Sequence, residues 1–246
     1  EITSQADLGG IGGVFGGAPN PGGLLGQTWI ATDVSNGPSR GNVYLLSSVD
    51  PPDGSDPLDI GFARSLDGGL TWEPPTIVND DFVLGSWQWF GTLSVAPNGR
   101  IDAVWNDTRN TGLNHLSELY YAYSPDAGTT WSKNVRVGPI FNSHVGWPLT
   151  NHKLGDYYHM VSDDTGANLA YAATYNDEQD VYFLRIGFPD IDTDRDIDLR
   201  DFAGFQNCFS GEGGGVSEGC GLFDVDRDTD VDWTDYMGLS NLLVGP

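Results

Sequence analysis

The chain contains one eight-residue motif twice, at matching places of a longer internal repeat. The motif Ser-x-Asp-x-Gly-x-Thr-Trp starts at Ser65 and again at Ser124, 59 residues later. Its chemistry is that of a hairpin turn, because the Asp carboxylate can accept backbone N–H groups and the Gly permits a positive φ. The Trp then anchors the returning strand in a core. These features predict a fold made of strands joined by tight turns.

Each motif follows strand-like segments that recur about every 60 residues. Apolar strands start at three turn glycines, Gly41, Gly99 and Gly166, and a short strand precedes each glycine, from Trp29, Thr92 and Tyr157. A further strand follows each of them and ends at Ser65, Ser124 or Ile186. Repeats of this length with several short strands are typical of radial or stacked β architecture. The sequence predicts a mainly β fold with about three units, behind a Gly-rich leader at residues 9 to 26.

The two motifs resemble Asp-boxes, the repeat of sialidase-like (BNR-repeat) β-propellers, over about residues 27 to 186. The residues that carry the resemblance are Ser65, Asp67, Gly69, Thr71, Trp72, Ser124, Asp126, Gly128, Thr130 and Trp131. The family implies that Asp-boxes lie at blade rims and stabilise turns, so a structural role is expected for both Asp residues. Because sialidase-like propellers have six blades, three units imply an incomplete propeller. A missing half-propeller or a second copy of the chain would complete it.

Near the C-terminus, a twelve-residue acidic pattern occurs twice with an offset of 34 residues. Both copies place Asp at positions 1, 3, 5, 7, 9 and 12: Asp190, Asp192, Asp194, Asp196, Asp198 and Asp201, then Asp224, Asp226, Asp228, Asp230, Asp232 and Asp235. Calcium takes six to eight oxygen ligands, and a twelve-residue loop supplies them from these positions. Position 7 contributes its backbone carbonyl, so Asp196 and Asp230 need not coordinate through their side chains. The pattern predicts two EF-hand-type loops with two calcium ions. Position 6, usually Gly, is Arg195 or Thr229, so we expect the second site to be weaker.

A helical pattern follows each loop, with Leu199, Phe202 and Phe205 on one face and Trp233, Tyr236 and Leu239 on another. Loop–helix pairs in tandem, without entering helices, resemble dockerin type I modules. The resemblance implies a calcium-binding module at residues 187–246, behind propeller blades at residues 1–186. It also implies a cohesin-like partner, or packing of the module against its own propeller, in a secreted or cell-surface bacterial protein.

Composition excludes several classes of protein. The net charge of −24 argues against nucleic-acid binding and against docking on an anionic membrane. No apolar run approaches the ~20 residues of a membrane-spanning helix.

The two cysteines, Cys208 and Cys220, flank a Gly-rich segment and suggest a disulfide in an oxidising compartment, with free thiols as the alternative. The chain starts at Glu1 without a signal peptide, so a processed or trimmed chain is expected.

Catalytic candidates are few. A sialidase-type enzyme would need an arginine cluster, a Tyr nucleophile with a Glu partner, and an acidic acid/base, which the resemblance implies. The residues to test are Arg109, Asp107, Tyr157 and Glu118, together with Tyr158 beside Tyr157 and Glu178 elsewhere in the chain. The same stretches also read as a polar turn and as core strand. The four histidines, His115, His144, His152 and His159, have no metal-ligand spacing.

Three functions remain open. The leading hypothesis is a binding or structural propeller that presents a carbohydrate- or protein-binding face and is attached through its calcium module. The second is an exo-acting glycoside hydrolase of sialidase type in polysaccharide catabolism, since dockerin-like tails often accompany such enzymes. The third is a structural surface or fibre protein.

Overall fold

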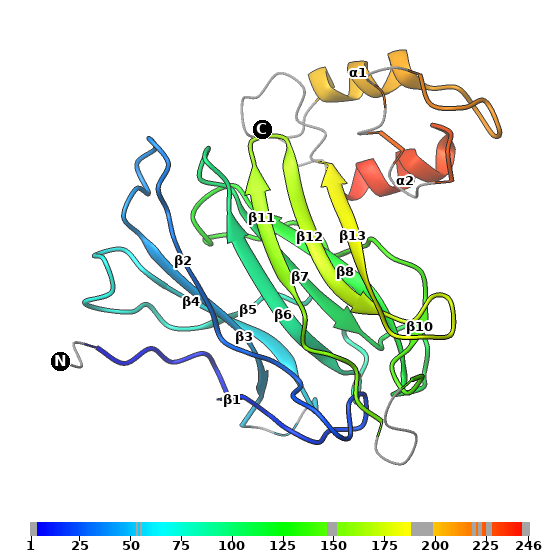
Figure 1. The fold of residues 1–246 in the computed structure, drawn as a ribbon. Coiled ribbons are helices and arrows are strands. Elements are labelled where there is room, and N and C mark those ends of the chain that lie inside the picture. Colours follow the sequence, from blue (N-terminus) through cyan, green and yellow to red (C-terminus); the bar gives the residue numbers. More distant parts are fainter. Residues whose placement is uncertain are drawn as a thin grey trace.

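The computed structural model describes residues 4–52, 54, 56–146, 152–187, 199–217, 220, 223–224 and 228–242. Three antiparallel sheets and two helices make up this part of the chain (Figure 1). Sheet 1 consists of β1 (Ile11–Gly12), β2 (Trp29–Thr32), β3 (Val43–Asp50), β4 (Asp59–Ser65) and β5 (Thr76–Ile77). Strands β2 to β5 form a meander, and β1 pairs with the far end of β3.

The second and third sheets repeat the meander. Sheet 2 consists of β6 (Gln88–Val95), β7 (Ile101–Asp107), β8 (Leu116–Ser124), β9 (Val135–Arg136) and β10 (Phe141–Asn142). Sheet 3 consists of β11 (His159–Asp163), β12 (Gly166–Ala173) and β13 (Asp180–Gly187). The expected strand ends at Ser65 and Ser124 are confirmed, and the third strand ends one residue beyond Ile186. The mainly β prediction is confirmed, whereas membership of a six-bladed ring stays a prediction.

Apolar side chains join neighbouring sheets into two buried clusters. Tyr44 and Phe62 of sheet 1 pack with Trp105 of sheet 2, and Trp89 of sheet 2 packs in a cluster that also holds Leu169 of sheet 3. Residues two apart on a strand point to the same face, so each middle strand offers one face to each neighbour. The first strands of the three meanders consequently lie next to one another, with β6 between β2 and β11.

The N-terminal leader runs across sheet 1 and continues to sheet 2. A Cβ on Gly61 would lie 2.1 Å from the Leu8 carbonyl oxygen, so the leader backbone crosses β4 at a residue without a side chain. Further along, the buried Leu25 accepts a hydrogen bond from the Phe90 N–H, 2.7 Å away, through its carbonyl oxygen. The leader is thus a fixed part of the fold.

The outward face of sheet 3 is bare within the described chain. Val161, Val181 and Phe183 are 55%, 61% and 71% exposed. Apolar sheet faces of this kind are usually covered by another surface. The expected missing half-propeller, or a second copy of the chain, remains a prediction for this face.

The helices α1 (Leu199–Cys208) and α2 (Trp233–Leu242) lie near the end of β13 (Figure 1). Phe205 and Leu239 are buried in the same cluster as Leu184 of β13, whereas Leu199 and Trp233 are largely exposed. Each predicted apolar helix face is therefore buried only beyond its first turn. The boundary near Gly187 coincides with the end of β13, and the division into two domains stays a prediction.

A disulfide joins the end of α1 to the segment before the second acidic loop. Cys208 and Cys220 are bonded, with their Cα atoms 5.4 Å apart, so the predicted disulfide is confirmed. None of the helices that the structure describes has the length and apolar character needed to cross a membrane.

Candidate functional site

The first Asp-box is a closed hydrogen-bond network around one carboxylate. Asp67 Oδ1 accepts from the backbone N–H groups of Leu70 and Thr71 at 3.0 and 2.8 Å. Its Oδ2 accepts from the Thr71 hydroxyl at 2.6 Å, and Ser65 donates to Oδ1. These bonds, led by that of the Thr71 hydroxyl, lower the pKa of Asp67 to about 2. The carboxylate is fully used in holding the turn.

The second Asp-box has the same network and also touches sheet 1. Asp126 accepts from Thr129 and Thr130 as Asp67 does from its own turn. Arg64 of β4 donates to the Thr129 hydroxyl at 2.6 Å, and the Trp131 ring meets the Phe62 ring edge-on at 5.1 Å. Trp131 is half-buried, so it anchors a seam between sheets and not the centre of a core.

Three of the candidate catalytic residues, Arg109, Asp107 and Glu118, lie in one hydrogen-bond network, and their donors and acceptors already have protein partners. Arg109 donates to Asp107 Oδ2 and Asp80 Oδ1, both at 2.8 Å, and to the Asn134 side-chain oxygen at 3.1 Å. Its guanidinium also lies 4.3 Å from the centre of the Tyr120 ring. Burial raises the pKa of Asp107, and Arg109 opposes that rise. Arg109 is thus a clamp between sheet 2 and the loop that leaves sheet 1.

Glu118 joins this network from β8. It accepts from Asn110 and from Arg136, each at 2.8 Å, and Asn110 also donates to the Tyr120 hydroxyl. Each arginine within the described part of the chain has a protein partner. A substrate carboxylate would therefore have to displace an existing acceptor.

The tyrosine candidates lie elsewhere. Tyr157 is 67% exposed on the segment before β11 and, within the described residues, has no hydrogen bond or ring contact with the Arg109 network. Tyr158 is buried; its hydroxyl donates to the Ala172 carbonyl at 3.0 Å and accepts from Asn106 at 2.8 Å. Burial raises the pKa of Tyr158 well above its ordinary value. Glu178 is exposed on the turn before β13. The structure therefore does not bring the predicted Tyr and Arg together.

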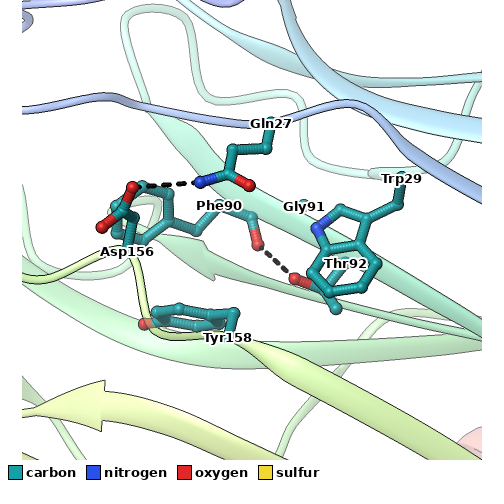
Figure 2. Close-up of a pocket in the computed structure, with 7 residues that line it drawn as sticks. All are labelled: Gln27, Trp29, Phe90, Gly91, Thr92, Asp156 and Tyr158. Carbon is teal, nitrogen blue, oxygen red and sulfur yellow. Dashed lines mark hydrogen bonds between the residues drawn. The ribbon is translucent and has the colours of Figure 1, made fainter.

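A pocket opens where the start of β2 and the residue Gln27 before it meet β6 and the segment before β11 (Figure 2). It is an open hollow in which about 200 Å³ of empty space, open solvent included, is bounded by Gln27, Trp29, Phe90, Gly91, Thr92, Asp156 and Tyr158. The Gln27 amide donates to Asp156 Oδ2 at 3.0 Å. An aromatic ring, an amide, a carboxylate and a hydroxyl thus face one space, with one negative charge and no basic side chain in the lining.

The floor of this pocket is shaped by a bulge in β6. The pairing of β6 with β7 shifts between Trp89 and Thr92, and Phe90 has a φ of 58°. A positive φ costs an aromatic residue on the order of 1–3 kcal/mol and persists only where the surroundings enforce it. The contact between the Phe90 N–H and the Leu25 carbonyl is one such constraint. The bulge turns Gly91 and Thr92 toward the pocket.

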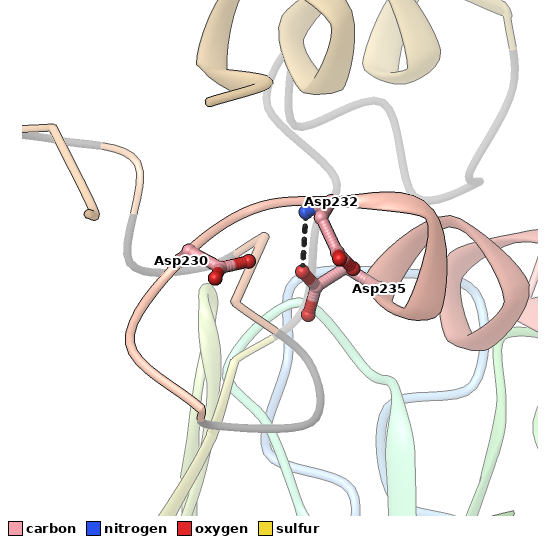
Figure 3. Close-up of side chains that lie close together, drawn as sticks. All are labelled: Asp230, Asp232 and Asp235. Atoms are coloured by element: carbon pink, nitrogen blue, oxygen red, sulfur yellow. Dashed lines mark hydrogen bonds between the residues drawn. The ribbon is translucent and has the colours of Figure 1, made fainter. Parts of the chain in front are cut away.

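The second acidic loop brings three carboxylates together (Figure 3). One oxygen each of Asp230, Asp232 and Asp235 lie within 4.8 Å of one another. Asp235 is fully buried, and Asp230 Oδ1 is buried without a hydrogen-bond partner. Thr229 at position 6 has a φ of 77°, so the loop makes the expected left-handed turn despite its β-branched residue. This donor set fits a hard cation such as calcium.

The other acidic positions are only partly visible. Asp224 and Asp228 belong to the described residues, whereas Asp226 and Asp190 to Asp198 lie outside them. Asp201, at position 12 of the first loop, is fully buried on α1. The first predicted calcium loop is therefore described only at its last ligand position.

Comparison with known proteins gives a partial match. No family model matches the chain. A sialidase from Paraclostridium sordellii is 30% identical in an alignment of 107 residues that covers 37% of this chain and 26% of that protein. Among solved structures, the Hadza microbial sialidase Hz136 has a TM-score of 0.45 at 19% identity, over 65% of this chain and 35% of its own. An α-L-arabinanase from Penicillium chrysogenum in complex with arabinobiose has a TM-score of 0.40 at 14% identity, and the match covers 70% of this chain and 48% of that structure.

The chain thus spans about a quarter of the curated relative that it matches. The matched stretch is sialidase-like in sequence, in agreement with the resemblance of the two Asp-boxes. The sequence reasoning did not find the pocket, because Gln27 and Asp156 are 129 positions apart and neither belongs to a motif.

Proposed function

We propose that the sheets form a carbohydrate-binding surface and that the pocket around Trp29 and Asp156 takes a neutral sugar. The observation that carries this proposal is the pocket lining. The flat ring of Trp29 can pack against the apolar face of a sugar. Gln27, Thr92 and Asp156 can orient its hydroxyls, which is how a few polar groups give a pocket its specificity.

The alternative, a sialidase-type hydrolase, is less well supported. A sialoside carries a carboxylate, which the Asp156 charge would repel and the chain's net charge of −24 would disfavour. The described arginines are engaged by protein acceptors, and the buried Tyr158 hydroxyl resists ionisation. The sialidase-like match supports an origin among sugar-processing proteins, and the geometry favours binding over catalysis.

Titration calorimetry tests the proposal on the full chain. The probes are neutral oligosaccharides from plant polysaccharides, with sialyllactose as the anionic probe. Trp29→Ala should abolish binding of a neutral probe, and Asp156→Asn should weaken it. Phe82→Ala is the matched control, because Phe82 is 99% exposed and does not line the pocket. Binding of sialyllactose alone, or equal binding by Trp29→Ala, would contradict the proposal.

A second function is calcium binding by the C-terminal region. Asp230, Asp232 and Asp235 would hold the ion, which would neutralise three like charges packed within 4.8 Å. The unpaired, buried Asp230 Oδ1 is the supporting observation. We further propose two ions in all, with the first bound by the loop that ends at Asp201, and an extracellular setting in which the module attaches to a cohesin-like partner.

Hydrogen exchange of α2 tests this function. Excess chelator should remove the protection of α2 and leave β7 and β8 protected, because the carboxylates then repel one another. Asp235→Asn should lower calcium affinity, whereas Glu212→Gln, an exposed acid in the same region, should not. Protection of α2 that is identical with and without chelator would rule out a structural calcium ion at this loop.

A further inference from the structure

Three of the four histidines meet in one stack, although their sequence spacing shows no pattern. The rings of His144 and His152 are parallel, with their centres 4.6 Å apart and an angle of 5° between the planes. The centre of the His115 ring lies 5.4 Å from the centre of the His144 ring, with an angle of 30° between the planes. The three residues come from the loop before β8, the turn after β10 and the segment before β11. We call His115, His144 and His152 the His stack.

The His stack holds the leader against sheets 2 and 3. The His144 Nε2 bonds to the Ala18 carbonyl oxygen at 2.8 Å, so this nitrogen carries the proton and donates. The His152 carbonyl accepts from the Gly22 N–H at 2.8 Å. Beside them, Ser143 donates to the Pro19 carbonyl at 2.6 Å. The residues 18–22 of the leader are thus fastened by the segments that carry the stack.

The same two segments supply both partners of the polar contact in the pocket. Gln27 follows the fastened leader, and Asp156 follows His152 by four positions. Between them, the buried Asn20 accepts from the Leu154 N–H at 2.8 Å and donates to the Leu154 carbonyl at 3.3 Å. Loosening the leader at the His stack would therefore separate Gln27 from Asp156.

The surroundings of His144 favour a neutral imidazole at this position. The His152 Nδ1 is buried without a hydrogen-bond partner, and burial lowers the pKa of His144, with the His152 and His115 rings lowering it further against the opposing Ala18 bond. Leader residues 14–25 carry no charged side chain. The charged residues on the packed segments are Lys153 and Asp156 beside His152, Arg109 on the loop of His115, and Asp177, Glu178 and Asp180 on the turn before β13.

None of those carboxylates forms an ion pair with a stack histidine in the described residues. A proton added to His144 thus meets two neighbouring imidazoles without a compensating acid. Burial lowers the pKa of His144 in the fastened form below its ordinary value near 6.5, so protons bind the open form more tightly and acid favours that form. Stability is full above that pH and is lost as the pH falls below it.

We propose that the His stack is an acid-sensitive clasp, which fastens the leader at neutral pH and releases it, and with it the Gln27 side of the pocket, below about pH 6. The clasp does not depend on what the pocket binds. A shared metal ion is a poorer reading of the same residues, because parallel stacked rings direct their lone pairs alongside one another and not to a common point.

Hydrogen exchange of residues 14–25 in the full chain tests the clasp at pH 7.5 and pH 5.5, after correction for intrinsic exchange. Wild-type exchange in this segment should rise about tenfold at the lower pH, while β7 and β8 keep their protection. His144→Gln retains an amide donor for the Ala18 carbonyl and should lose the pH step. The control is His159→Gln, which removes the one histidine outside the stack and should keep the step.

A second variant and a zinc measurement complete the test. If His144→Gln does not fold, His152→Gln removes the neighbouring charge and should also flatten the step. Wild-type protection that is equal at both pH values, or a pH step that survives both substitutions, would overturn the proposal. A gain of protection on adding zinc at pH 7.5 that His152→Gln abolishes would also overturn it, in favour of a metal site.

Discussion

The seam between sheets 1 and 2 can be tested at one glycine of the second Asp-box. Gly128 has a φ of 79°, and a Cβ there would lie 2.4 and 2.5 Å from two Phe62 ring atoms, Cε1 and Cζ. Gly69 holds the same position in the first Asp-box, with a φ of 91° and no neighbour within 4 Å of its Cβ. The pair Gly128→Ala and Gly69→Ala therefore differs in the neighbour and not in the turn.

The expected magnitudes follow from that difference. Left-handed backbone costs Ala about 1–2 kcal/mol in both variants, and both gain the same small benefit from a less flexible unfolded chain. Forcing a methyl group against the buried Phe62 ring adds about 1–3 kcal/mol in Gly128→Ala alone. For a chain of this size, the additional cost corresponds to a melting temperature about 2–12 °C lower than that of Gly69→Ala.

Scanning calorimetry of the two variants beside wild type measures this difference. Equal melting temperatures would refute the reasoning, because they would mean that the second Asp-box does not pack against sheet 1. A double variant sharpens the test. Phe62→Leu should reduce the additional cost of Gly128→Ala, since the coupled residues share one contact, and should leave the cost of Gly69→Ala unchanged.

The remaining predictions concern the candidate site and the stability of the chain. Arg109→Met should lower the free energy of unfolding by about 3–5 kcal/mol, because it leaves the buried Asp107 unpaired, and calorimetry should find sugar binding by the folded fraction unchanged. The lowered pKa of Asp67 stabilises the fold above about pH 4, and that stability is lost as the pH falls toward 2. The melting temperature of Asp67→Asn should therefore depend less on pH between about 4 and 2 than that of wild type. Reduction of the Cys208–Cys220 disulfide should lower the stability of the helical region by about 3 kcal/mol, measured by the loss of helical circular dichroism. Light scattering of wild type should show a dimer if the bare face of sheet 3 pairs with a second copy, and Phe183→Ser should then give monomers; a wild-type monomer of 26.5 kDa would exclude that pairing.

Local chemistry made the strands and turns predictable. The Asp-box network involves residues within four positions of one another, so its motif specifies both the turn and the role of Asp67. The internal repeat of segments that start at turn glycines likewise placed the strands that end at Ser65 and Ser124. The same holds for the disulfide, whose cysteines are 12 positions apart.

The motif of the second acidic loop predicted its ligand positions but not its backbone conformation. Its spacing predicted carboxylate ligands at Asp232 and Asp235 and only a backbone carbonyl at Asp230, whereas the Asp230 carboxylate also lies with the other two. The sequence left open how the loop turns at Thr229, since a β-branched residue disfavours positive φ. The backbone nevertheless adopts a φ of 77° at this residue.

The pocket, the Arg109 clamp and the His stack were decided only by the tertiary structure. Gln27 and Asp156 meet across 129 positions, and Arg109 reaches Asp80 across 29. Such contacts depend on how sheets pack against one another, which no local pattern encodes. For the same reason, the candidate Arg109 could be found from the sequence, whereas its full set of partners, and hence its structural role, could not. The sequence alone thus determined the strands, the turns and the acidic loop, and the packing of the sheets determined which side chains share a site.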